Sequence, residues 1–100
     1  MKYNKLVRDK IPQYIIKKGA KPIYHIADKK EYWKKLKQKL SEEVKEFQKD
    51  ESMEELADVL EVIDAIIKYK GFNKIELSRI KKNKAEERGK FKDRIILDEA

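Results

Sequence analysis

Cysteine is absent from this sequence of 100 residues, and only three glycines and two prolines occur. Without cysteine there is neither a disulfide framework nor thiolate chemistry. No apolar run approaches the roughly 18–20 residues that a membrane-spanning helix needs. The first residues also lack the apolar core of a signal peptide. We therefore expect a cytoplasmic protein with no membrane partner.

The charge is high and unbalanced. Charged residues make up 45% of the chain, and the formal net charge is +7. At this length we expect one domain spanning residues 1–100. A small domain with so many charges buries a limited core, which favours association with a second copy. The excess of basic residues favours phosphate-bearing partners, with nucleotides, nucleic acid or neither as the alternatives.

One acidic block stands out from this basic background. Residues 41–64 hold ten acidic residues against two lysines, a net charge of −8 (2 − 10) in a chain whose total is +7. Ten like charges in a short segment repel one another. Such a block needs a physical reason, and the spacing of its carboxylates offers one.

Hydrophobic periodicity and helix-breaking residues predict a chain of helices. Three capping-box patterns mark helix starts; they are Asp28 with Glu31, Ser52 with Glu55, and Asn73 with Glu76. We predict helices over about 13–18, 29–49, 53–70 and 74–87. Residues 22–27 alternate weakly and predict a short strand or an extended crossing. The fold class is therefore all-α, an antiparallel helical bundle with at most a short extended segment.

Two carboxylate pairs lie on consecutive predicted helices. Glu43 and Glu46 are three residues apart, and so are Glu55 and Asp58. Residues at this spacing share a helix face, and a short turn brings the two helices back antiparallel. The pairs flank apolar faces, where unpaired carboxylates are costly. A divalent cation would compensate them, and Mg²⁺ and Mn²⁺ prefer oxygen ligands.

A plainer interpretation of the acidic block is a solvated helix face. Lys45 and Lys49 are spaced to pair with neighbouring glutamates, and charge runs usually form such faces. Glu55 also has a simpler role available, because its side chain can bond back to the Ser52 backbone in the capping box.

Three segments of the chain resemble one protein superfamily. The pattern EE-x-x-E at 42–46, followed by E-x-x-D at 55–58 within ELADVLEVI, is similar to the metal-binding signature of the MazG-like all-α nucleoside triphosphate pyrophosphohydrolases. YNKLVRDKIP at 3–12 resembles the opening of a small single-domain, phosphoribosyl-ATP pyrophosphohydrolase-like branch. KAEERGKF at 84–91 resembles its closing K-x-x-x-R-G-G-F segment, with Lys90 in place of the second glycine.

The resemblance implies an enzyme that hydrolyses a nucleotide between its α- and β-phosphates, giving a monophosphate and pyrophosphate. The implied cofactor is Mg²⁺, with Mn²⁺ as an alternative. Its expected ligands are Glu43, Glu46, Glu55 and Asp58. Either Glu46 or Glu55 would accept the proton of the attacking water. Relatives of this kind are commonly homodimers or homotetramers.

Phosphates also need fixed cations. Lys84 and Arg88 lie four residues apart on one predicted helix face, and Lys5 and Arg8 lie three apart in the matched opening. We expect these residues to bind substrate, and either pair could clamp the pyrophosphate group. Asp9 could pair with Arg8 or add a carboxylate near the metal, and the pairing with Arg8 is favoured.

Two other functional classes remain open. A small basic nucleic-acid-binding protein would explain the net charge, but no standard reading helix, zinc motif or aromatic-basic surface motif is present, so nucleic acid is an unlikely partner. A catalytically silent helical interaction module would use the acidic block to dock onto the basic end of another subunit.

Overall fold

The structure is a computed structural model that describes residues 3–100. It contains four helices, α1 (Ile11–Lys17), α2 (Lys29–Lys49), α3 (Met53–Lys70) and α4 (Lys74–Arg88). Within residues 3–100 there is no strand. The all-α prediction is confirmed, and the observed bounds follow the predicted ones closely. The largest difference is at α1, which begins two residues before the expected start, 11 against 13.

The helix starts follow the predicted capping boxes. The Asp28 carboxylate accepts a hydrogen bond from the Glu31 amide at 2.8 Å. The Ser52 hydroxyl oxygen accepts one from the Glu55 amide, and the Asn73 side-chain oxygen accepts one from the Glu76 amide. Each bond satisfies an amide that the first turn of a helix leaves without a partner. The caps therefore fix where α2, α3 and α4 begin.

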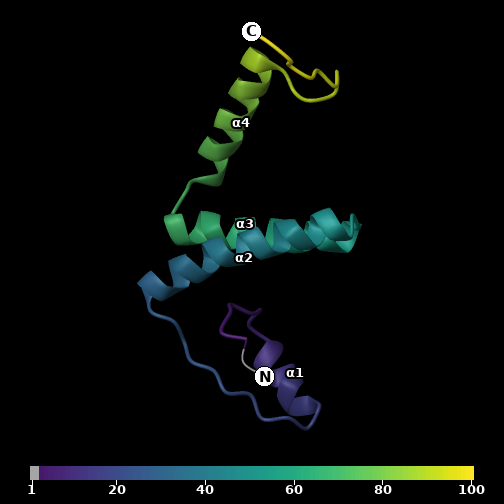
Figure 1. The fold of residues 1–100 in the computed structure, drawn as a ribbon. Coiled ribbons are helices and arrows are strands. Elements are labelled where there is room, and N and C mark those ends of the chain that lie inside the picture. Colours follow the sequence, from purple (N-terminus) through teal and green to yellow (C-terminus); the bar gives the residue numbers. More distant parts are fainter. Residues whose placement is uncertain (1–2) are drawn as a thin grey trace.

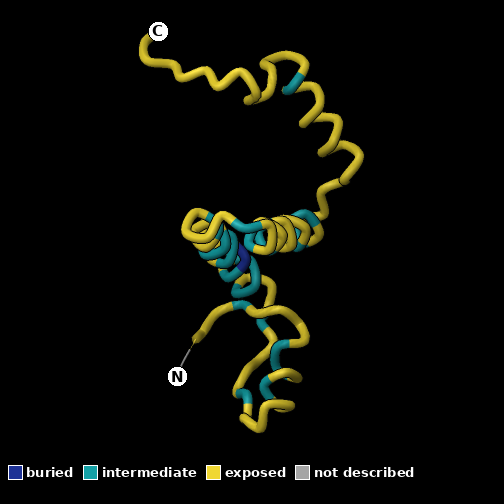
Figure 2. Tube along the Cα trace, turned by 90° about the vertical axis from the view of Figure 1, so that its right-hand side faces the viewer, coloured by how far each residue is buried: buried dark blue, intermediate teal, exposed yellow. Residues whose placement is uncertain are grey.

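Helices α2 and α3 form an antiparallel hairpin across the middle of the molecule (Figure 1). The short turn at residues 50–52 reverses the chain between them. Leu36 of α2 and Val62 of α3 are the only described residues that are buried. The buried part of the chain, dark blue in Figure 2, lies where these two helices meet. The core of a single chain is thus one seam between two helices.

The remaining segments lie on opposite sides of this hairpin. Residues 3–10 and α1 lie on one side, and residues 18–28 return from α1 to α2 as an extended crossing without strand pairing (Figure 1). Helix α4 projects from the other side, and the tail after it is exposed. This separation decides which charged residues can meet.

The turn after α4 accommodates the departure at position 90. Gly89 has a φ of +83°, a conformation that glycine adopts readily. Lys90 is not among the residues with positive φ. Its side chain therefore does not strain this turn.

None of the helices in residues 3–100 is both long enough and apolar enough to cross a lipid bilayer.

Candidate metal centre

Three carboxylates converge next to the turn between α2 and α3. Glu43 comes from α2, and Glu55 and Asp58 come from the first turns of α3. One oxygen from each lies within 4.8 Å of an oxygen of the other two. All three residues are half-buried. Because the turn is short and the helices are antiparallel, the late residues of α2 face the early residues of α3.

The donor set suits a hard divalent cation. All three donors are carboxylate oxygens, the ligand type that Mg²⁺ and Mn²⁺ prefer. At an Mg–O distance of about 2.1 Å, neighbouring ligands of an octahedron lie about 3.0 Å apart and opposite ligands about 4.2 Å apart. Three ligands include at most one opposite pair, so oxygens up to 4.8 Å apart must approach by up to roughly 1.8 Å, which rotation about the glutamate and aspartate side-chain bonds supplies. The three residues therefore fit such an ion, with water or substrate oxygens completing the shell.

The convergence of the three carboxylates affects the pKa of Glu55. Partial burial raises the pKa of its carboxyl group, and repulsion from Asp58, Glu46 and Glu43 raises it further. A cation at the cluster would reverse this effect by favouring the ionised form.

The simpler role considered for Glu55 is not observed. The Ser52 amide donates to the Asp50 carbonyl at 2.7 Å, whereas the Glu55 amide donates to the Ser52 hydroxyl oxygen. The Glu55 backbone thus belongs to the cap, while its side chain turns to the other two carboxylates.

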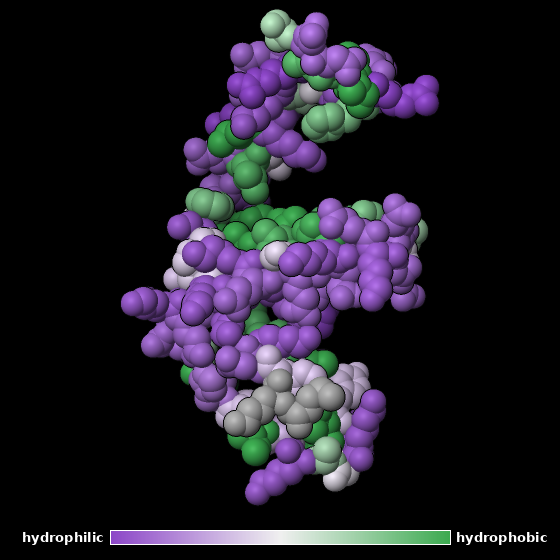
Figure 3. All heavy atoms as spheres, viewed as in Figure 1, coloured by the Kyte–Doolittle hydropathy of each residue, from purple (hydrophilic) through white to green (hydrophobic). Residues whose placement is uncertain are grey.

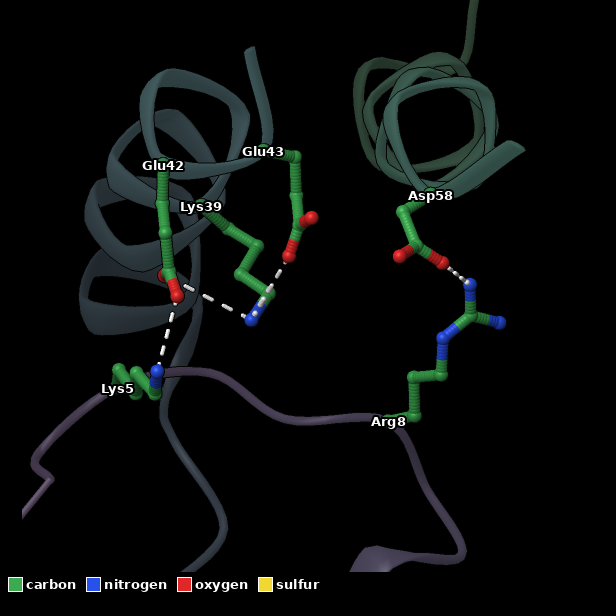
Figure 4. A network of polar contacts seen from close by, with 6 residues as sticks. All are labelled: Lys5, Arg8, Lys39, Glu42, Glu43 and Asp58. Carbon is green, nitrogen blue, oxygen red and sulfur yellow. Dashed lines mark hydrogen bonds and ion pairs between the residues drawn. The ribbon is translucent and has the colours of Figure 1, made fainter. Parts of the chain in front are cut away.

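Basic side chains approach the cluster from two directions (Figure 4). Arg8, from the segment below the hairpin, bonds an Asp58 oxygen at 2.8 Å. Lys39, one turn before Glu43 on α2, lies 3.3 Å from a Glu43 oxygen. Two of the three carboxylates are therefore partly neutralised by the chain itself. The expected pairing of Arg8 with Asp9 is wrong, because Arg8 reaches across to α3 instead.

A second ion pair anchors the same segment to α2. Lys5 donates to Glu42 at 2.9 Å, and Lys39 lies 3.6 Å from the other Glu42 oxygen. The hydrogen bond from Lys5 lowers the pKa of the Glu42 carboxyl group, and the same bond raises the pKa of Lys5. Lys5 and Arg8 thus hold residues 3–10 over the carboxylate end of the hairpin, next to the candidate centre.

Glu46 occupies a different position from the other three expected metal ligands. It is exposed, and it is not among the described residues whose oxygens converge. Its charge still acts on the Glu55 carboxyl group. The structure therefore brings together Glu43, Glu55 and Asp58, and leaves Glu46 at the margin.

Lys84 and Arg88 are not brought to this cluster within one chain. Both are exposed residues of α4. That helix projects from the side of the hairpin opposite residues 3–10, which contact the carboxylates (Figure 1). Of the four expected substrate-binding residues, Lys5 and Arg8 adjoin the candidate centre, whereas Lys84 and Arg88 lie away from it.

Two members of the network were not expected from the sequence. These are Glu42 and Lys39, neither of which the sequence singles out as a site residue. The sequence does contain a signal for these ion pairs. Lys39 lies three residues before Glu42 and four before Glu43, which is the spacing of ion pairs on a helix.

Aromatic residues gather at the other end of the hairpin. The rings of Trp33 and Tyr69 are stacked with centroids 5.2 Å apart, and Tyr32 meets Tyr69 edge to face at 5.5 Å. Trp33 precedes Glu43 by ten residues, about 15 Å along a helix. This cluster therefore closes the open end of the hairpin and does not contact the carboxylates.

A scan of protein-family models, a search of curated proteins and a search of solved structures each found no match to this chain.

Proposed function

We propose that this protein is a Mg²⁺-dependent nucleotide pyrophosphohydrolase of the MazG-like all-α superfamily. Membership of that superfamily is part of the proposal, and it rests on the three matched segments. The observation that carries the activity is the convergence of Glu43, Glu55 and Asp58 within 4.8 Å of one another. Three carboxylates at one point repel one another, so their convergence favours a bound cation.

The proposed reaction adds water across the bond between the α- and β-phosphates of a nucleoside triphosphate or similar phosphorylated nucleotide. The products are a nucleoside monophosphate and pyrophosphate. Glu43, Glu55 and Asp58 would hold Mg²⁺, or Mn²⁺ in its place, with Glu46 as an outer carboxylate. Once bound, the ion would neutralise phosphate charge and lower the pKa of a coordinated water.

Residues of this chain would accept the proton of the attacking water and bind the phosphates. Glu55 is the better of the two expected proton acceptors, because its carboxylate lies in the cluster that would hold the ion, whereas Glu46 is exposed at the margin. Lys5 and Arg8 lie at the edge of the carboxylates and are placed to exchange their present acid partners for phosphate oxygens. Lys84 and Arg88 would reach a substrate only from another copy of the chain or after α4 moves.

The setting proposed for this activity is the cytoplasm, with self-association into a homodimer or homotetramer. Both are expectations from the sequence. The accessible surface of a single chain supports self-association, because it is 9970 Å², against about 6000 Å² for a compact monomer of 12.0 kDa.

The decisive experiment measures pyrophosphate release from a panel of nucleoside triphosphates, with and without Mg²⁺. Glu55→Gln keeps the size of the side chain and removes its charge, so activity should fall by at least about a hundredfold. Glu54→Gln is the matched control, because Glu54 is the adjacent exposed glutamate outside the cluster. Equal activity of the two variants, with helical content preserved, would rule out the assigned site.

One observation favours a second candidate, the silent interaction module. Arg8 and Lys39 already neutralise part of the cluster without any ion. If Arg8 and Lys39 serve only to neutralise the carboxylates, Mg²⁺ would not bind to the cluster and would not change the thermal stability of the protein. A ligand that binds only the folded state raises the melting temperature. An Mg²⁺ titration followed by thermal unfolding therefore separates the two candidates.

A further inference from the structure

The open end of the α2–α3 hairpin gathers lysines around the stacked rings of Trp33 and Tyr69. The ammonium nitrogens of Lys37 and Lys70 lie 5.3 Å and 5.0 Å from the centre of the Trp33 ring. Lys37 belongs to α2 and Lys70 to α3, so cations from two helices approach one aromatic ring. Both rings are half-buried and keep part of their surface exposed. Two like charges near one ring repel each other, and an anion between them would offset that repulsion.

Two open hollows adjoin these rings and meet at Asp28, which lines both. Tyr32 and Tyr69 line the first hollow, and Trp33 lines the second. Six lysines line the two hollows; they are Lys29, Lys30, Lys34, Lys35, Lys37 and Lys70. We call these six lysines and three aromatic residues the basic face.

The fold does not neutralise the charge of the basic face. Two acidic residues also line the hollows, and both are already engaged: Asp28 accepts the Glu31 amide at 2.8 Å, and the Glu31 carboxylate pairs with His25 at 2.9 Å. Within residues 3–100, none of the six lysines forms an ion pair with a carboxylate. At the turn end of the hairpin, by contrast, Lys5 and Arg8 both pair with acids. The open end is therefore free to attract an anionic partner.

Folding assembles the basic face from parts that form no motif in the sequence. Trp33 and Tyr69 are 36 residues apart, and they meet because the antiparallel hairpin brings the start of α2 beside the end of α3. Proteins that bind single-stranded nucleic acid combine cations, which contact the phosphates, with aromatic rings on which the bases stack. The face therefore fits a ligand that carries both phosphates and unstacked bases.

Other anionic partners fit this face less well. A helix that binds a membrane surface needs an apolar face beside its basic one. On the side shown in Figure 3, hydrophilic residues cover α2, and the apolar band lies along α3 towards α4. A free nucleotide is usually held in a cleft that encloses most of its surface, whereas both hollows are open. A duplex keeps its bases stacked inside and offers none to the rings.

We propose that a single-stranded nucleic acid, RNA or DNA, binds the basic face. Its phosphates contact Lys37, Lys70 and the neighbouring lysines, and a base stacks against the exposed part of the Trp33 ring. The site is separate from the candidate metal centre, since Trp33 precedes Glu43 by ten residues, about 15 Å along a helix. Binding of a strand there goes beyond the proposed hydrolysis and does not depend on it.

The fluorescence of Trp33 provides a direct test, because it is the only tryptophan of the chain. Oligothymidylate and oligouridylate of about eight nucleotides are titrated into the full-length protein with EDTA present, so that any Mg²⁺-dependent hydrolysis is silent. Either strand should change the fluorescence to saturation. The logarithm of the affinity should fall linearly with the logarithm of the salt concentration, with a slope between about −1.4 and −4 for two to six phosphate contacts. If neither strand changes the fluorescence, the proposal is overturned.

A pair of lysine variants locates the contact. Lys37→Gln combined with Lys70→Gln should weaken binding at least about fivefold at low salt and make the salt slope less steep by about 1.4, because two phosphate contacts are lost. Lys45→Gln combined with Lys49→Gln is the control, since it removes the same charge from two exposed lysines in the second half of α2. Equal weakening in the two double variants would show a response to net charge alone and would overturn the assigned face.

The wild-type protein alone distinguishes the other anionic partners. Thymidine monophosphate, a DNA duplex and vesicles containing phosphatidylserine are titrated at equal phosphate concentration. Each should bind at least about tenfold more weakly than the single strands. Binding of any of the three as tightly as a single strand would overturn the proposal. None of these results bears on pyrophosphate release, which is measured with Mg²⁺ and nucleoside triphosphates, so the two proposals can fail separately.

Discussion

Arg8 and Asp58 are fifty residues apart in the sequence and form an ion pair of 2.8 Å. The contact ties the segment before α1 to the first turns of α3. Asp58 is also one of the three carboxylates of the candidate metal centre. An ion bound there competes with the guanidinium for the same carboxylate. Arg8 therefore links the position of residues 3–10 to the occupancy of the centre.

Replacing Arg8 with glutamine should strengthen metal binding and weaken substrate turnover. The loss of a partly exposed ion pair frees Asp58, and such pairs contribute about 0–1 kcal/mol, or up to roughly fivefold in affinity. Mg²⁺ affinity, measured by calorimetry, should rise by a factor in this range. The KM for nucleotide should rise as well, because a phosphate contact is lost.

Lys10→Gln is the control for this change. It removes one positive charge from the end of the same segment, and no ion pair of Lys10 with a described carboxylate is present. If both variants change Mg²⁺ affinity equally, the effect of Arg8 is one of net charge and not of its contact with Asp58.

Metal binding should weaken as the pH falls, and the weakening should begin above the ordinary glutamate pKa of 4.5. The pKa of Glu55 is raised in the folded protein, so protons compete with the ion at a higher pH than for an isolated glutamate. Without metal, the folded state binds this proton more tightly than the unfolded state does. Stability therefore rises as the pH falls through the raised pKa.

The measurement is the Mg²⁺-induced rise in melting temperature between pH 4 and pH 8. Glu55→Gln should abolish this pH dependence and raise the melting temperature of the metal-free protein at neutral pH. Glu54→Gln should keep the wild-type pH profile. A profile that is the same in Glu55→Gln and in the wild type would show that another group controls the ion.

The Lys5–Glu42 pair should stabilise the fold only within a defined pH range. The pKa of Glu42 is lowered, so its contribution is present above 4.5 and is lost as the pH falls through the lowered value. The pKa of Lys5 is raised, so its contribution is present below 10.5 and is lost as the pH rises through the raised value. Both side chains are at least one-third exposed, so solvent screening keeps the contribution small.

Glu42→Gln should therefore lower the free energy of unfolding by about 0.5 kcal/mol at neutral pH and by less at pH 3. Urea unfolding at the two pH values measures the difference. A cost that is the same at both would assign the effect to packing and not to the ion pair.

The fold was predictable because its signals are local. The capping residues Asp28, Ser52 and Asn73 each form the bond that their spacing indicates. These bonds depend on residues three apart, so a sequence shows them directly. The position of α4 was not predictable in the same way, because its near-uniform polarity marks no face for packing.

The candidate site was predictable only where helix periodicity controls it. Glu43, Glu55 and Asp58 converge because each lies towards the facing helix of a hairpin with a short turn. Glu46 is three residues from Glu43, but the extra rotation of the helix leaves it exposed. The reach of Arg8 to Asp58 spans fifty residues and depends on how an irregular segment crosses the hairpin, which no sequence period encodes.

Leu36 should be the most sensitive apolar position of the single chain. It is 1% exposed and lies in the seam between α2 and α3, where it and Val62 are the only buried residues described. Leu36→Ala removes its packing and leaves a cavity, which typically costs about 2–5 kcal/mol. A domain stabilised by about 5–15 kcal/mol would lose much of its stability, so urea unfolding should show a much lower midpoint.

Ile23→Ala is the matched control, since Ile23 is 96% exposed in the crossing before α2. Its effect on the free energy of unfolding should stay within about 0.5 kcal/mol. Because Leu36 packs α3 against the helix that carries Glu43, its loss should also loosen the carboxylate cluster. The Mg²⁺-induced rise in melting temperature should therefore shrink in Leu36→Ala and remain unchanged in Ile23→Ala. If Leu36→Ala lowers stability but keeps the full response to Mg²⁺, the ion does not depend on the seam that aligns the two helices.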